Sequence, residues 1–200
     1  SVVVSSSQPI AAISNHTLYT SAGDAYSSFE GLEAGSNTVY VPSLISDYNG
    51  WTSWMSIQNV GTSNVSDVTV TIYTDGVGVP THSDTLSIKA GAPEVYSMAD
   101  IAGALGTHWK GSAIISSPSE PIAVTVEWQQ NTHLRSFSGV PASALSTEYG
   151  LPVLRKWYSA GWNTSVRVLN AGGSPADVTF TYYGGGLGSP VVVNDTVVTS

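Results

Sequence analysis

The chain has no cysteine among its 200 residues. Disulfide bridges and thiolate metal sites are therefore excluded, and stability must come from packing within the chain or against neighbouring subunits. Basic residues are scarce, with six Lys and Arg against fourteen Asp and Glu, which gives a net charge of −8. This charge, with the scatter of the few basic residues, argues against a nucleic-acid-binding surface. No apolar run approaches the roughly twenty residues of a membrane-spanning helix.

Charged residues are also few, at 10% of the chain, whereas hydrophobic residues make up 42%. Such a composition is that of a globular chain with enough apolar side chains for two modest cores. The abundant Ser, Thr, Gly and Val are typical of a bacterial β-protein that is secreted or exposed on the cell surface. We therefore expect an extracellular location and no cofactor.

Alternation of apolar residues with Ser or Thr predicts seven β-strands in the middle of the chain. Turn sequences such as Asn49-Gly50 and Asp75-Gly76 separate them, and Pro9 and Pro121 mark bulges or strands that switch sheets. This spacing predicts an all-β fold, an immunoglobulin-like antiparallel β-sandwich. The predicted strands cover 37–44, 55–59, 68–73, 85–90, 94–97, 112–116 and 122–128, and 99–105 is the one predicted helical stretch.

Segments of the sequence recur at an offset of about 110 residues, a domain-sized period instead of a solenoid repeat. The opening residues 1–11 resemble 112–123, and 40–44 resemble 150–154. Likewise, 50–53 return as 161–165, and 67–73 return as 177–183. The beginning and the end of the chain therefore both match its middle.

The repeat predicts one complete β-sandwich module and one module split between the two ends of the chain. Neither end segment is expected to fold alone, because about fifty residues with one uncovered sheet face bury too little apolar area. The counterpart of 91–110 is missing from both end segments. The predicted divisions are donor strands over 1–17, a connector over 18–38, the complete module over 39–130, a linker over 131–147 and the incomplete module over 148–200.

Two resemblances follow from these segments. The sequences at 50–53, 57–61, 111–116 and 121–124 resemble the tandem β-sandwich repeats of secreted and surface proteins of environmental bacteria. This resemblance covers nearly the whole chain and implies fold and location but little chemistry. In architecture, the split module resembles donor-strand pilins and pilus-like fibres, in which the N-terminal strand of one subunit completes the sandwich of the next. That resemblance implies a head-to-tail homopolymer.

We therefore expect a structural subunit of an extracellular bacterial filament, assembled by insertion of residues 1–14 into the groove left by 148–200 of the next subunit. The donor-strand anchors would be Val2, Val4, Ile10 and Ile13. Two alternatives stay open: a window of a longer repeat array in a surface stalk or adhesin, and a carbohydrate-binding module of a secreted enzyme. We expect no enzymatic activity, since the chain has no Gly-x-Ser-x-Gly motif and no convincing catalytic base.

Tryptophans are the strongest candidates for a binding surface. Trp51 and Trp162 occupy equivalent positions in the repeat, which favours a packing role. The other four have no repeat partner and are therefore the candidate contacts for a ligand or a neighbouring subunit: Trp54, Trp109, Trp128 and Trp157.

Polar motifs predict little further chemistry. The histidines, His16, His82, His108 and His133, lack metal-ligand spacing and are expected in solvated loops. Asp75-Gly76 is expected to be a hairpin turn instead of a calcium loop, because acidic residues at alternate positions are missing. Four Asn-x-Ser/Thr sequons make Asn15, Asn64, Asn163 and Asn194 candidate attachment sites for N-linked glycans. The Ser- and Thr-rich surface leaves O-linked glycans as an alternative.

Overall fold

A computed structural model describes residues 2, 4, 6–8, 10–21, 23–32, 35–152, 154, 164–184 and 189–198. An N-terminal hairpin consists of β1 (Ile13–Thr20) and β2 (Gly23–Glu30), and a C-terminal hairpin of β12 (Ala176–Tyr182) and β13 (Val191–Val197). The central strands are β3 (Thr38–Ser46), β4 (Thr52–Asn59), β5 (Val65–Thr74), β6 (Pro80–Ile88), β7 (Pro93–Ser97), β8 (Trp109–Ser116), β9 (Ile122–Gln130), β10 (His133–Ser138) and β11 (Val140–Pro141). Short helices are α1 (Ala102–Leu105) and η1 (Ala142–Ala144).

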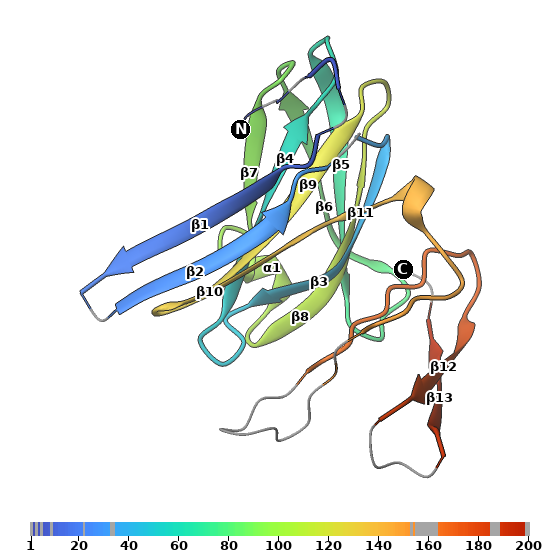
Figure 1. Ribbon diagram of the computed structural model, residues 1–200. Helices are drawn as coiled ribbons and strands as arrows, with labels where there is room; N and C mark the ends of the chain where they lie inside the picture. The colour runs from blue at the N-terminus through green and yellow to red at the C-terminus, as the bar shows by residue number, and fades with distance from the viewer. Residues whose placement is uncertain are drawn as a thin grey trace.

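The central strands form two antiparallel sheets that pack face to face (Figure 1). One sheet has the order β11-β3-β8-β5-β6, and the other has the order β10-β9-β4-β7. The predicted all-β, antiparallel β-sandwich is thus confirmed. No helix among the described residues is long and apolar enough to cross a membrane.

Alternation along the strands builds the core. On β5, Val68, Val70 and Ile72 are fully buried, while Thr69 and Thr71 lie on the opposite face of the sheet. The buried apolar cluster runs from Val39 to Val126, so it lies within the central sandwich. The end segments add almost nothing to this core.

Each of the seven predicted strands overlaps a strand of the structure, and α1 lies within the predicted helical stretch 99–105. The turn at Asn49 and Gly50 is confirmed, since both residues have positive φ and the flanking Tyr48 and Trp51 exchange two 3.0 Å hydrogen bonds. The Asp75-Gly76 turn is also confirmed by its backbone bond and the positive φ of Gly76.

At Pro121 the chain passes from one sheet to the other, between β8 of the five-stranded sheet and β9 of the four-stranded sheet. Its carbonyl oxygen accepts a 2.9 Å hydrogen bond from the Val60 N–H. The predicted sheet switch is therefore confirmed at Pro121. A residue without an N–H is tolerated there because the ladder of hydrogen bonds is interrupted. Pro9, its counterpart in the repeat, lies outside the described residues.

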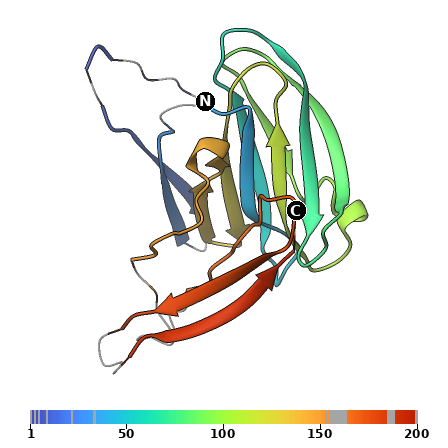
Figure 2. The same cartoon turned by 90° about the vertical axis from the view of Figure 1, so that its right-hand side faces the viewer.

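Two segments differ from the sequence prediction. The expected connector, 18–38, contains the end of β1 and all of β2, and the expected linker, 131–147, contains β10 and β11. Because 18–36 is rich in Ser, Gly and acidic residues, the alternation of these strands is weak. Figures 1 and 2 show the N-terminal hairpin beside β10, on the outer side of the four-stranded sheet.

Small side chains let this hairpin approach the sheet closely. Ala25 on β2 is buried, and the hydroxyls of Ser27 on β2 and Ser136 on β10 are in contact. His16 and Leu18 of β1 are half-buried, whereas their neighbour Thr17 is exposed. The hairpin thus forms a third layer on the sandwich.

A polar cluster joins the edge strands of the two sheets. Tyr96 on β7 donates a 2.5 Å hydrogen bond to Asp84 on β6, and Nε2 of His82 lies 2.9 Å from the same carboxylate oxygen. These two hydrogen bonds, that of Tyr96 first, lower the pKa of Asp84. Burial, followed by the bond to Asp84, raises the pKa of Tyr96.

Candidate assembly interface

Asn59 fixes the turn that links β4 to β5. Its side-chain amide donates to the carbonyl oxygens of Ser63 at 2.8 Å and Ile88 at 3.2 Å. Its side-chain oxygen accepts the N–H of Gly61 at 2.9 Å. Because Asn59 is fully buried, these bonds satisfy polar groups that would otherwise be costly in the core.

Asn170 makes the same set of bonds near the C-terminal hairpin. Its amide donates to the carbonyl oxygens of Ser174 at 2.8 Å and Val197 at 3.2 Å, and its oxygen accepts the Gly172 N–H at 2.9 Å. The repeat is therefore present in three dimensions, with β12 and β13 as the counterparts of β5 and β6. Sequence reasoning missed this pair, although an Asn-x-Gly motif starts at both Asn59 and Asn170.

The N-terminal hairpin repeats another part of the central sandwich. The Gly139 N–H, just after β10, donates a 2.8 Å hydrogen bond to the carbonyl of Val124 on β9. In the same way, the Gly31 N–H, just after β2, donates a 2.9 Å bond to the carbonyl of Ala12. The hairpin β1–β2 is thus the counterpart of β9–β10.

A short sequence match supports this correspondence. Residues 28–32 read Ser-Phe-Glu-Gly-Leu, and 136–140 read Ser-Phe-Ser-Gly-Val. This match could have revealed the hairpin from the sequence. Taken with the match of 1–5 to 112–116, it gives the N-terminal segment counterparts of β8, β9 and β10.

Three apolar residues of the N-terminal segment are exposed where their repeat counterparts are fully buried. The exposed side chains have between 54% and 79% of their surface accessible, while the buried counterparts have none. Exposed apolar side chains at matched core positions make this segment a candidate for burial against another surface. The pairs, exposed residue first, are Val2 and Ala113, Val4 and Ile115, and Ile10 and Ile122.

The C-terminal segment shows the same contrast. Its apolar residues at core positions of the repeat are 42% to 52% exposed, and their counterparts on β3 and β4 are fully buried. None of the described residues between 148 and 175 belongs to a strand, although the counterparts do. The pairs, exposed residue first, are Leu151 and Val41, Leu154 and Leu44, and Val168 and Ile57.

The strand β12 has an unpaired edge. In the central sandwich, β5 pairs with β6 on one side and with β8 on the other. Within the described residues, β12 pairs with β13 alone. A two-stranded hairpin is marginal by itself, and its open edge offers N–H and C=O groups to a further strand.

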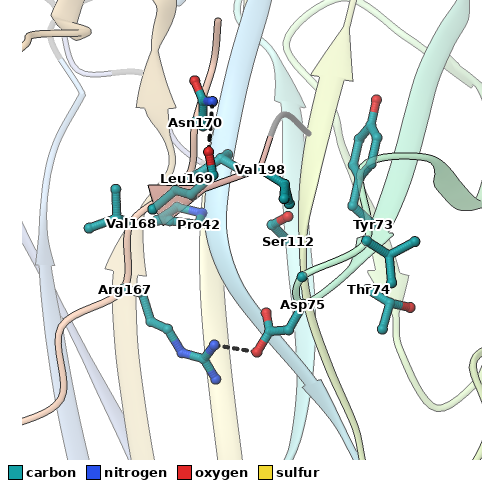
Figure 3. A pocket seen from close by; sticks show the side chains of 13 residues that line it. Pro42, Tyr73, Thr74, Asp75, Ser112, Arg167, Val168, Leu169, Asn170 and Val198 are labelled. Atoms are coloured by element: carbon teal, nitrogen blue, oxygen red, sulfur yellow. Dashed lines mark hydrogen bonds and ion pairs between the residues drawn. The ribbon is translucent and has the colours of Figure 1, made fainter. Parts of the chain in front are cut away.

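The C-terminal segment is held on the outer face of the five-stranded sheet (Figure 3). Arg167 forms an ion pair with Asp75, in the turn between β5 and β6. A cavity of about 60 Å³ remains between Val168 and Leu169 of this segment and the sheet, where burial raises the pKa of Tyr73. Figure 2 shows the hairpin β12–β13 extending beyond the central sandwich.

Among the four expected donor-strand anchors, Ile13 differs from the other three in its repeat position. Ile13 begins β1, where it pairs with Glu30 of β2 and is 65% exposed. In the repeat it corresponds to Thr125, whose side chain lies on the outer face of β9 and not in the core. The anchors that match core positions are Val2, Val4 and Ile10.

The tryptophans fall into different environments. Trp109 is buried in the core and donates a 2.8 Å hydrogen bond from Nε1 to Thr74, so its proposed role as a surface contact is wrong. Trp128 packs edge-on against Trp51, as aromatic rings prefer. Trp54 lies on the outer face of β4 beneath the N-terminal hairpin. Trp157 and Trp162 lie outside the described residues.

The sequence predicted that all four histidines lie in solvated loops, and this is wrong for those that lie on strands. His16 and His82 lie on strands, and each contacts a carboxylate: Nδ1 of His16 is 2.6 Å from Glu127. Glu127 is far from His16 in the sequence, and Asp84 is two residues from His82 on the same face of β6. Motifs based on metal-ligand spacing do not identify pairs of either kind. His108 is exposed in a turn, and His133, which starts β10, stacks on Trp51. Among the described residues, no group of three or more ligating side chains could hold a metal ion.

The sequons differ in accessibility. Asn15 is exposed on the outer face of β1. Asn64 is exposed in the loop before β5, where its side-chain oxygen accepts the Ala90 N–H at 3.0 Å. Asn194 lies on β13 and accepts a 2.9 Å hydrogen bond from the Thr179 hydroxyl. Asn163 lies outside the described residues.

No protein-family model matches the chain, and no curated protein sequence matches it. Among solved structures, the chain is similar to the crystal structure of Thermotoga maritima 1070, at 15% sequence identity and with a TM-score of 0.45. That match covers 56% of this chain and 98% of the other chain.

Proposed function

We propose that the protein is a structural subunit of an extracellular filament in which copies join head to tail by strand addition. Residues 2–12 of one copy would complete the C-terminal segment of the next copy. The repeat supports this pairing, because the two segments carry complementary parts of the same module. Addition of this kind is heterologous and gives an open fibre unless the rotation closes a ring.

The exposed apolar residues at core positions carry the proposal. Val2, Val4 and Ile10 on one segment match core positions of β8 and β9, and Leu154 and Val168 on the other match core positions of β3 and β4. Full burial of a side chain of this size contributes about 1.5–3 kcal/mol. Joining the segments would therefore give a substantial driving force without any new fold.

The central sandwich supplies the register of the added strand. In the antiparallel pair of β8 and β5, Ile115 lies opposite Val70, and Ala113 lies opposite Ile72. Carried through the repeat, this register places Val4 opposite Phe180 of β12, and Val2 opposite Tyr182.

The lack of a counterpart for 91–110 is compatible with this assembly. That stretch holds β7 and α1, and β7 is the edge strand of its sheet. A module without an edge strand still has both facing sheets. The polar cluster that joins β6 to β7 is also replaced, since Val191 and Val193 stand where the central module has His82 and Asp84.

Sedimentation velocity and electron microscopy of the full chain test the proposal. The wild type is expected to form linear oligomers, and Val4→Asp or Phe180→Asp is expected to stay monomeric, because a charge at a core position opposes burial. Val95→Asp is the matched control, since Val95 is 63% exposed on β7 and belongs to neither segment. Oligomers that survive Val4→Asp would refute the proposal. A wild type that stays monomeric at all concentrations would also refute it, and would favour a module of a longer repeat array.

A further inference from the structure

A groove of about 360 Å³ lies between β1 and the outer face of the four-stranded sheet. Its floor is formed by Trp54 of β4 with Glu127 and Gln129 of β9, and His16 and Leu18 of β1 form one wall. The volume is at the lower end of the range for small-ligand pockets, about 300–1,000 Å³. It therefore fits a ligand of one or two rings.

The sheet register brings aromatic and polar groups together on the floor. Trp54 is directly opposite Glu127, and Thr52 is opposite Gln129, with all four side chains on the outer face of the sheet. An indole ring thus lies beside a carboxylate and a primary amide. Opposed side chains of adjacent strands are about 4.5–5.5 Å apart at Cβ, so one small ligand can reach all three groups.

His16 positions the carboxylate. Its Nδ1 is 2.6 Å from Oε1 of Glu127, whose side chain is only 14% exposed. The edge of Phe29 packs on the His16 ring, which limits rotation of the imidazole. Gln129 also lines the groove, and within the part of the chain that the structure describes its amide makes no hydrogen bond to another protein group.

The fold itself does not require Trp54. Residues that pack the sandwich recur in the repeat, as Trp51 does in Trp162 and Asn59 does in Asn170. The same offset places Ser165 at the position of Trp54, so the indole of Trp54 is specific to the central module. A large aromatic ring that is not a repeated packing residue needs another explanation.

We infer that this groove binds a neutral saccharide. The flat apolar face of the indole matches the C–H face of a pyranose ring, while Glu127 and Gln129 match its hydroxyl groups. An anionic ligand would meet the Glu127 carboxylate and a chain of net charge −8. A wholly apolar ligand would cover both polar side chains without replacing their bonds to water.

Titration of the full chain with cellobiose, N,N′-diacetylchitobiose, maltose and lactose tests the inference. At least one is expected to shift the NMR signal of the Trp54 indole N–H with millimolar saturation. Trp54→Ala is expected to weaken binding by about tenfold or more. Val95→Ala, on the same sheet face but outside the groove lining, should bind as the wild type does.

A second variant keeps the test decisive if Trp54→Ala does not fold. Gln129→Ala removes only the unpartnered amide and should weaken binding of the same saccharide, with unchanged circular dichroism. The inference is overturned if none of the four disaccharides shifts the Trp54 indole signal. It is equally overturned if binding is unaffected in both variants.

Discussion

Tyr96 donates a 2.5 Å hydrogen bond to Asp84, and this bond joins β7 of one sheet to β6 of the other. Each of these strands is the edge of its sheet, so the pair closes one side of the sandwich. The carboxylate also receives His82, and no other carboxylate among the described residues has two such side-chain partners at a sheet edge. At this edge the two sheets are held together by hydrogen bonds, whereas in the centre of the sandwich they are held together by apolar packing.

The Asp84 pair predicts a pH dependence of stability. The hydrogen bonds from Tyr96 and His82 lower the pKa of Asp84 below its ordinary value of 3.8. A lowered folded-state pKa gives stability that is present above the unfolded-state value and is lost as the pH falls through the folded-state value. Thermal unfolding below about pH 4 should therefore be less steeply pH-dependent in Asp84→Asn than in the wild type.

Asp100→Asn is the matched control for this prediction. It removes the same charge from an exposed turn position outside the Tyr96–Asp84 pair. The wild-type pH profile should be retained in this variant. Equal slopes in the wild type and Asp84→Asn would contradict the role given to the carboxylate.

Gly111 on β8 predicts a steric effect. A Cβ at this position would collide with the Tyr73 carbonyl oxygen and the Trp109 ring, neither of which has room to move. Gly111→Ala should lower the free energy of unfolding by about 1–3 kcal/mol or more. Gly103→Ala in α1, where a Cβ meets nothing within 4 Å, should leave it unchanged or raise it. Urea unfolding measures both, and similar values for the two variants would contradict the prediction.

The sequence predicted the central sandwich well because its strands have one buried face. Val68, Val70 and Ile72 show this directly in the sequence, because every second side chain of the strand faces the core and must be apolar. The Asn49-Gly50 turn and the Asp75-Gly76 turn could be predicted from a few neighbouring residues, because backbone positions with positive φ favour Gly and Asn.

The N-terminal hairpin could not be predicted in this way. Its inner face carries Ala25 and Ser27, which allow close approach to another sheet and do not mark a core. The groove was hidden for a related reason: His16 and Glu127 are 111 positions apart, and only the third layer brings them into contact. Contacts of this kind depend on tertiary placement, not on local period.

Truncation to alanine is expected to affect monomer stability very differently at the two matched core positions, Ile115 and Val4. Ile115→Ala, at a fully buried site, should lower the free energy of unfolding of the monomer by about 2–5 kcal/mol. Val4→Ala, at the counterpart that is 60% exposed, should change it by no more than about 0.5 kcal/mol. The same Val4→Ala should weaken head-to-tail association. Concentration-dependent sedimentation and urea unfolding separate the two effects, and a large loss of monomer stability in Val4→Ala would contradict the proposed assignment.

The absence of cysteine makes the register of assembly directly measurable. If Val4 of one copy lies opposite Phe180 of the next, a mixture of Val4→Cys and Phe180→Cys chains should form an intermolecular disulfide on mild oxidation, since opposed Cβ atoms are about 4.5–5.5 Å apart. A Val4→Cys chain mixed with Thr181→Cys is the control, because Thr181 is the next residue along β12 and lies on the other face. Mass spectrometry of the cross-linked peptides reads the outcome. Equal yields at positions 180 and 181 would show that the strand is not added in this register, because side chains one residue apart cannot both face the same partner.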